Sequence, residues 1–195
     1  MAMTEPAEPR PTRAPRRDAA RRREALIAAA AACFARQGYG VPLETIAAAA
    51  GVGRATLYRN FEDREALALA IFSSAVDRLE AMLDPAAPIE TMLATTVRAG
   101  TGALSLFARI AADLHLDDAN RAAFHQLGMR METIFAPVLQ AAQRRGEVSA
   151  EVTSRDLVLS LRMAGSLVLP FMDEAEVSAK IEAASRLLLK GLRPR

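Results

Sequence analysis

The stretch GVGRATLYRNF, Gly51 to Phe61, decides the fold. It opens with two glycines separated by one residue and continues as a short run of mixed polar and apolar residues. Because successive residues of an α-helix are rotated by about 100°, Leu57 and Phe61 share one helix face, and Ala55 and Arg59 point away from it. The stretch therefore predicts a sharp turn followed by a short helix that is buried on one side and polar on the other.

The residues before this turn predict a second short helix. The segment LETIAAAA, residues 43–50, places Leu43, Ile46, Ala47 and Ala50 on one side. Pro42 suits the start of a helix, where its missing N–H would have no partner. Small alanines let a neighbouring helix approach closely. A short helix, a glycine turn and another short helix together predict a helix-turn-helix unit.

Helical spacing continues on both sides of this unit. The preceding helix is expected over residues 18–37, with Asp18 as its cap and Gly38 at its end. After the unit, Asp63 is expected to cap a long helix that stops at Asp84 and Pro85. The apolar positions of the first helix are Leu26, Ile27, Ala30, Cys33 and Phe34. Cys33 is the single cysteine, so no disulfide framework exists, and it is interpreted as a small buried apolar residue.

A short helix that is polar on its outer faces suits a groove of DNA. Its outermost residues would meet base edges, and its flanks would meet phosphates on either side. The alternative is a solvated surface helix with no partner. The preceding helix and the glycine turn favour DNA binding, because a helix-turn-helix commonly places its second helix in the major groove.

The segment LETIAAAAGVGRATLYRNFEDREAL, residues 43–67, resembles the N-terminal domain of TetR-family transcriptional regulators. The resemblance implies an all-α fold of about nine helices, in which a three-helix DNA-binding domain precedes a helical bundle for ligand binding and dimerisation. It implies a sequence-specific DNA-binding regulator without a cofactor. The residues that carry it are Ile46-Ala47, Gly51-Val52, Thr56-Leu57-Tyr58, Phe61 and Leu67.

Carried over residue by residue, the resemblance also implies which side chains meet DNA. Tyr58 and Thr56 would bind phosphates, and Ala55 and Arg59 would read bases. Pro42 stands where Ser or Thr usually caps the second helix, so the phosphate contact of that cap would pass to Thr45, the nearest hydroxyl. The full set of implied DNA contacts is Thr45, Arg54, Ala55, Thr56, Tyr58, Arg59 and Asn60.

The chain is expected to divide into a basic, disordered arm (1–17), the DNA-binding domain (18–64), and a connector helix with the ligand-binding and dimerisation domain (65–195). The arm combines four prolines with scattered arginines and shows no apolar periodicity. It has two interpretations that the sequence leaves open. It can reach into a minor groove or along the DNA backbone, or it can serve as a solubilising tail.

Residues 88–192 predict helices throughout. One helix is expected to close near Gly100 to Gly102, with another starting at Leu104; a long helix runs from Asn120 to Arg145 and is kinked at Pro137. A helix then opens at Thr153, and a last one covers about 174–190. The resemblance implies that this half binds a small effector and dimerises through its last two long helices.

The helix from Asp156 is apolar on more than one face, which favours a two-fold partner. The residues predicted for the dimer interface are Leu161, Ala164, Gly165, Leu167, Val168, Ile181 and Leu188. Met and Phe side chains are candidates for an apolar pocket, although such residues at helical spacing are more often simply core. The pocket candidates are Met82, Met92, Phe107, Phe124, Met129, Phe135 and Met163.

Composition excludes several other classes. The chain has 195 residues, of which 51% are hydrophobic, and a formal net charge of +2. No run is long and apolar enough to span a bilayer. The run RRREALIAAAAACFA resembles a signal peptide but continues as a helix face, so the protein is expected in the cytoplasm. The arginine-rich composition suits phosphate and base recognition, and a coding bias would give the same count.

Enzymatic and metal-binding roles are disfavoured. No nucleophile elbow, phosphate loop, zinc motif or pair of catalytic carboxylates is present. The cluster DLHLDD, Asp113 to Asp118, with His125 nearby, matches no defined metal spacing and is expected to cap the next helix instead.

The leading hypothesis is a homodimeric repressor that binds a pseudo-palindromic operator on double-stranded DNA and is released by an unknown small-molecule effector. The alternative is a dimeric helical binding module that acts through a protein partner, without ligand control.

Overall fold

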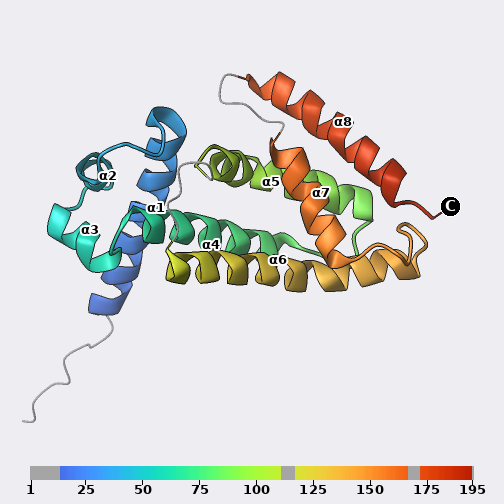
Figure 1. Ribbon diagram of the computed structural model, residues 1–195, viewed down its shortest axis with the longest axis horizontal. Helices are drawn as coiled ribbons and strands as arrows, with labels where there is room; N and C mark the ends of the chain where they lie inside the picture. The colour runs from blue at the N-terminus through green and yellow to red at the C-terminus, as the bar shows by residue number, and fades with distance from the viewer. Residues whose placement is uncertain (1–13, 111–116, 167–171, 195) are drawn as a thin grey trace, which may run out of the picture.

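The computed structural model describes residues 14–110, 117–166 and 172–194. Within these residues the chain is all helical and contains no strand, as the sequence predicted (Figure 1). The helices are α1 (Ala14–Gln37), α2 (Leu43–Ala49), α3 (Arg54–Asn60), α4 (Arg64–Met82), α5 (Ile89–Ile110), α6 (Asp118–Arg144), α7 (Ser154–Ser166) and α8 (Glu174–Leu192).

Helices α1, α2 and α3 form a small unit at one end of the molecule (Figure 1). Leu57 and Phe61 of α3 are buried against it together with Ile46 of α2, as the face arithmetic predicted. A buried core of this kind fixes the direction in which the outer face of α3 points. Cys33 of α1 is 1% exposed in the same core, as expected for a small apolar residue.

The turn between α2 and α3 depends on Gly51. Its φ of +67° lies in the left-handed region, which residues with a Cβ rarely adopt. The N–H of Gly51 donates to the carbonyl of Ala48 at 3.0 Å, and that of Val52 donates to the carbonyl of Ala47 at 3.0 Å. This is the Schellman arrangement, and it satisfies carbonyls that the end of α2 leaves without partners.

A polar cluster joins the end of α1 to the start of α4. The Arg64 guanidinium donates to the carbonyls of Tyr39 and Val41 and lies over the rings of Phe34 and Tyr39. The Tyr39 hydroxyl donates to Glu65 at 3.2 Å. The pKa of Tyr39 lies well above its usual range, mainly because the side chain is buried. Asp63 caps α4 by accepting the N–H of Ala66, as predicted. The first turn of α4 is therefore tied to the small unit.

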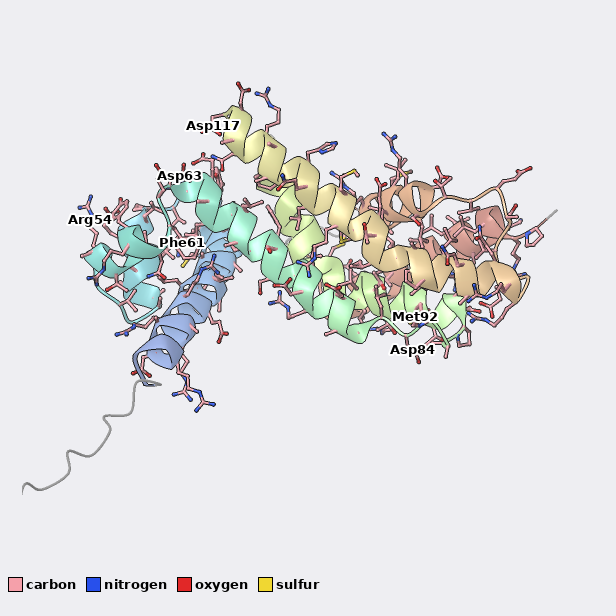
Figure 2. All side chains as sticks on the ribbon, turned by 90° about the horizontal axis from the view of Figure 1, so that it is seen from below. Arg54, Phe61, Asp63, Asp84, Met92 and Asp117 are labelled. Atoms are coloured by element: carbon pink, nitrogen blue, oxygen red, sulfur yellow. The ribbon has the colours of Figure 1, made fainter. Side chains whose placement is uncertain are left out.

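Helices α4 and α6 run side by side and both start near the small unit, as the positions of Asp63 and Asp117 show (Figures 1 and 2). Phe124 and Leu127 of α6 pack against the core of that unit. Arg130 of α6 reaches back to α4, where it pairs with Asp77 at 2.6 Å and with Glu80. Because Arg130 binds both carboxylates, it holds the middle of α6 to the second half of α4.

A second core lies among α5, α6, α7 and α8. Its fully buried side chains include Leu93, Val97, Phe135 and Leu157. Helix α8 packs against α5 and α7 on the outside of this group (Figure 1). The caps of α7 and α8 are Thr153, whose hydroxyl accepts the N–H of Asp156, and Asp173, which forms a capping box with Glu176.

Two predicted boundaries were wrong. Helix α5 continues through the glycines at 100 and 102, where the sequence predicted a break, so the described residues hold eight helices rather than about nine. Helix α1 begins at Ala14 and not at Asp18, because proline at its second position is tolerated in a first turn and the arginines that follow are good helix formers. The arm therefore becomes helical before its predicted end.

The start of α6 was predicted by the capping interpretation of the acidic cluster. The Asp117 carboxylate accepts the N–H of Asn120 at 2.7 Å, and the helix begins at Asp118. It then runs past Pro137 to Arg144. The remaining members of the cluster, from Asp113 to Leu116, lie outside the described residues.

Candidate nucleic-acid interface and internal cavity

The outer face of α3 gathers the polar side chains that the sequence singled out. Arg54, Ala55, Tyr58 and Arg59 are exposed, while Leu57 on the opposite face is 1% exposed. Arg54 points away from the rest of the molecule at its outer end (Figure 2). A rigid helix with one buried face thus presents two guanidiniums and a phenol to the solvent.

Contacts among these side chains organise the surface. Arg54 pairs with Glu44 of α2 at 3.1 Å, and its guanidinium lies 5.5 Å from the centre of the Tyr58 ring. Arg59 donates to the Thr56 hydroxyl at 3.1 Å. The Asn60 amide donates to the Thr56 carbonyl at 2.7 Å, so Asn60 and Thr56, both half-buried, are already engaged within α3.

The start of α2 lies beside this face. Pro42 occupies the cap position and makes no side-chain cap bond. Thr45 is exposed one turn into the helix, and its N–H donates to the Pro42 carbonyl at 3.0 Å. A hydroxyl is therefore available in the first turn, although the usual capping side chain is missing.

A cavity of about 520 Å³ lies between α4, α5, α6 and α7. Its volume falls within the ~300–1,000 Å³ that is common for small-molecule sites. The rings of Phe72 and Phe124 lie in its wall, with centres 5.9 Å apart and planes tilted by 57°. The main apolar lining residues are Phe72, Val76, Leu79, Phe124, Met131, Val158 and Leu161.

The polar lining is basic. Arg78 of α4, Arg121 and His125 of α6, and Arg162 of α7 are exposed, so they lie where the cavity opens to solvent. Thr96 of α5 lines the cavity from inside and is 2% exposed, and within the described residues its hydroxyl has no hydrogen-bond partner. A buried polar atom without a partner is uncommon in folded proteins.

Comparisons with known proteins agree with this architecture. The family model described as bacterial regulatory proteins, tetR family, matches residues 26–71. A TetR transcriptional regulator from Streptomyces coelicolor is 28% identical, with 88% of this chain and 98% of that chain covered and a TM-score of 0.64. A TetR transcription regulatory protein from Mycobacterium vanbaalenii is 27% identical, with 92% and 99% covered and a TM-score of 0.63. Residues 26–71 thus match the DNA-binding domain of the tetR family, and the whole chain shares the fold of TetR regulators. These comparisons support a DNA-binding transcriptional regulator.

Other solved structures share the fold of this regulator. One is the fatty acid degradation regulator FadR from Bacillus halodurans, which is 21% identical, with 89% of this chain and 97% of that chain covered and a TM-score of 0.66. No curated protein matches the sequence of the regulator.

The cavity of the regulator contains few of the predicted pocket residues. Met82 and Phe124 line it. Met92 and Phe135 are instead buried in the second core, and Met129 and Met163 are exposed, at 53% and 62%. The side chain of Phe107 lies outside the described part. In the sequence, a methionine or phenylalanine on a helix looks the same whether it faces a core, a cavity or solvent.

Sequence reasoning missed the polar lining of the cavity. In the sequence, Arg121 and Arg162 look like ordinary surface residues, Thr96 looks like a core position of α5, and His125 stands out only as a neighbour of the acidic cluster. No periodicity distinguishes them, because the cavity exists only where four helices meet. The single available signal is the excess of basic over acidic residues on the faces that converge there.

The predicted dimer residues of the regulator are mostly buried within one chain. Leu161, Ala164 and Ile181 are at most 4% exposed in the second core, so they offer no surface to a partner. Leu188 is half-buried. Gly165 lies on α7 but its burial is not described, and Leu167 and Val168 lie outside the described residues. Among the side chains of these two helices whose burial is described, the large apolar ones that are exposed are Leu159, Met163 and Leu187.

Two further features are absent from the described ranges. They contain no group of three His, Cys, Asp or Glu side chains placed to hold a metal ion. None of their helices has the combined length and apolar character that crossing a bilayer requires.

Proposed function

We propose that the regulator is a homodimeric repressor that binds a pseudo-palindromic operator through α3 and leaves it when a small molecule occupies the cavity. In this proposal the DNA-binding domain covers about residues 18–64, and residues 65–195 form the connector and the effector and dimerisation domain. The observation that carries the proposal is that α4 belongs to both parts.

The DNA contacts follow from the exposed face of α3. Arg59 and Ala55 would read base edges, with Arg59 exchanging its bond to Thr56 for a base acceptor. Tyr58, Thr56 and Arg54 would bind phosphates beside them, and Thr45 would supply the contact that Pro42 cannot make. Asn60 is the weakest member of the set, because its amide already bonds the backbone of α3.

The coupling runs through α4. Phe72 of α4 lines the cavity and also belongs to the core shared with α1, α2 and α3. Phe124 and Leu127 of α6 also line the cavity and pack against that same core. A ligand that prefers a different spacing of α4 and α6 would shift the population of the DNA-binding conformation by its difference in affinity for the two states.

Dimerisation would use the outer faces of α7 and α8. Leu159 and Met163 lie four residues apart on α7, and Leu187 of α8 is 72% exposed. Large exposed apolar side chains on two neighbouring helices are unusual for a monomer surface and common at interfaces. A dimer would place two copies of α3 about 34–36 Å apart, in successive major grooves.

Binding to the DNA upstream of its own gene tests the proposal, measured by fluorescence anisotropy. Arg59→Ala is expected to cost about 1–3 kcal/mol and to relax base preference, whereas Tyr58→Ala should weaken all sequences alike. Arg193→Ala, an equal change of charge at the opposite end of the molecule, is the control and should bind as wild type (Figure 1).

Two results would contradict the proposal. If Arg59→Ala and Arg193→Ala bind alike, α3 does not read the operator. If the wild-type protein binds no fragment of this upstream DNA but binds another protein, a helical binding module without ligand control is the better description.

A further inference from the structure

The first turns of α1 project beyond the core of the DNA-binding unit. Helix α1 begins at Ala14, but the first of its described side chains in the buried core is Leu26. At about 1.5 Å per residue, roughly 18 Å of helix precedes the core. In Figures 1 and 2 this projection leads past α3 and away from the half that holds the cavity, towards the side on which Arg54 lies. It therefore extends the surface that α3 presents.

The projection is basic. Its exposed basic side chains are Arg17, Arg21, Arg22 and Arg23. Two exposed carboxylates, Asp18 and Glu24, lie in the same stretch. Within the residues that the structure describes, no ion pair joins either carboxylate to an arginine. Four guanidiniums against two carboxylates leave the stretch positive, and a positive surface attracts polyanions.

The fold of the chain does not explain these arginines. Arg17, Arg21 and Arg22 make no hydrogen bond or ion pair with another described residue. The first turn of α1 has no acidic residue. Because the N-terminal end of a helix already has a partial positive charge, a basic residue there, such as Arg17, is slightly unfavourable for the helix. A partner with many negative charges suits such a stretch better than any contact within the chain.

Arg23 fixes the place where the projection leaves the DNA-binding unit. Its guanidinium lies 4.9 Å from the centre of the Phe61 ring, at the C-terminal end of α3. Helix α3 has seven residues and is about 10 Å long, so in a major groove ~12 Å wide its ends come close to the bordering backbones. Because the projection starts at one of these ends, its arginines would lie along phosphates rather than over bases.

From this arrangement we infer that residues 17–23 of α1 form a second DNA-binding surface, which holds the phosphate backbone beside the groove that α3 occupies. The contact is electrostatic and adds affinity without reading sequence. Arginine suits it, because its planar fork matches phosphate oxygens. The inference rests on the proposed function in taking α3 as the element that enters the groove, and it adds a surface outside the helix-turn-helix.

A triple variant tests the surface. Arg17→Gln, Arg21→Gln and Arg22→Gln together remove three charges and leave the contact of Arg23 with Phe61 in place. Binding of the full-length protein to the upstream DNA, and to a scrambled fragment of equal length, would be measured by anisotropy over a series of NaCl concentrations. Both fragments are expected to bind at least about fivefold more weakly. The slope of log affinity against log salt should flatten by at least about 1.8, because each protomer of a dimer loses at least one phosphate contact.

Two matched variants separate phosphate binding from other effects. Arg144→Gln, Arg155→Gln and Arg193→Gln together remove the same charge from exposed positions in α6, in α7 and after α8, and should keep the wild-type slope. The triple lysine variant of the projection keeps the charge and should also keep the slope. Melting curves of the triple glutamine variant of the projection should match or exceed those of the wild type, because the removed charges do not stabilise α1.

Four results would overturn the inference. They are a wild-type slope in the glutamine variant of the projection, a loss confined to the upstream fragment, equal losses in the lysine and glutamine variants, and an equal flattening in the distant triple variant. Arg59→Ala, measured in parallel, keeps the inference apart from the proposed function. Loss of binding in Arg59→Ala with an unchanged slope in the glutamine variant would remove only the inference. A flattened slope with unaffected binding of Arg59→Ala would keep the surface of α1 and remove the reading role of α3.

Discussion

Single residues set the geometry of the DNA-binding unit, and Gly51 is the clearest case. Nothing lies within 4 Å of the place where its Cβ would stand, so a side chain would meet no steric clash with its surroundings. The cost of a substitution would come from the backbone alone, because φ is +67°.

Gly51→Ala is therefore expected to lower the free energy of unfolding by about 1–2 kcal/mol, the penalty of a left-handed residue that carries a Cβ. Gly53→Ser is the matched control two residues later, where φ is −73° and a hydroxyl can cap α3. Its stability should equal or exceed that of the wild type. Urea denaturation of the three proteins measures both, and equal stability of Gly51→Ala would show that the turn relaxes.

Glu44 is an acidic residue beside the face that we propose to contact DNA. Its pair with Arg54 is exposed on both sides, 68% for Arg54 and 49% for Glu44, so it contributes little to stability. In the proposed operator complex, however, Glu44 would compete with phosphate for the Arg54 guanidinium.

Glu44→Gln is expected to tighten binding to all DNA sequences by about two- to fivefold, since an exposed pair is worth about 0.2–1 kcal/mol. Anisotropy at two salt concentrations would also show a steeper salt dependence. Glu90→Gln serves as control, because Glu90 occupies the same first-turn position in α5 and is exposed away from α3. Equal affinities of wild type and Glu44→Gln would mean that Arg54 does not bind phosphate.

At the scale of elements, a helix end could be predicted wherever the capping residue lies next to that end in the sequence. Asp63 and Thr153 cap the helices that the sequence assigned to them. The failures have non-local causes. A glycine inside a helix costs only about 1 kcal/mol, so packing along α5 outweighs the two glycines that suggested a break. Pairings such as Arg130 with α4 cannot be predicted from one sequence, because they depend on which helices become neighbours.

One such non-local contact caps α5. The Glu147 carboxylate, in the loop after α6, accepts the N–H of Ile89 at 2.9 Å and the guanidinium of Arg145 at 2.7 Å. The hydrogen bond from Arg145, followed by that from Ile89, lowers the pKa of Glu147 below its usual value. The folded state thus favours the ionised carboxylate. The resulting stabilisation is complete above the unfolded pKa, which is about 4.3, and is lost as pH falls through the lower folded value.

Glu147→Gln is therefore expected to melt below the wild type at pH 7, with a difference that shrinks once the pH falls below about 4. Glu151→Gln, an exposed glutamate in the same loop, should track the wild type throughout. Thermal melts over this pH range measure both. A gap between Glu147→Gln and wild type that stays constant with pH would show that charge is not the cause.

At the scale of the whole molecule, the DNA-binding unit was predictable and the cavity was not. The buried and exposed faces of α3 can be predicted from sequence spacing alone, because they depend only on one short helix and the turn before it. The cavity and the dimer face depend on the packing of four or more helices, so buried Leu161 and exposed Leu159 look alike in the sequence.

The outer faces of α7 and α8 supply the prediction at this scale. Met163→Glu and Leu187→Glu are each expected to convert the dimer to monomer, because a carboxylate would be buried in an apolar interface. Met129→Glu makes the same change at an exposed methionine of α6 and should leave the dimer intact. Sedimentation velocity measures the mass of each. A wild-type monomer, or dissociation by Met129→Glu alone, would show that these faces do not pair.

The seclusion of Cys33 has a practical consequence. A thiol that is 1% exposed in a packed core should resist maleimide reagents while the protein is folded. The natural chain can thus receive one new cysteine at an exposed position such as Glu62, just beyond α3, and carry a single fluorophore there. In a two-fold assembly each protomer would carry one dye. Energy transfer between the two dyes would then report in real time whether an added compound changes the distance between the two copies of α3.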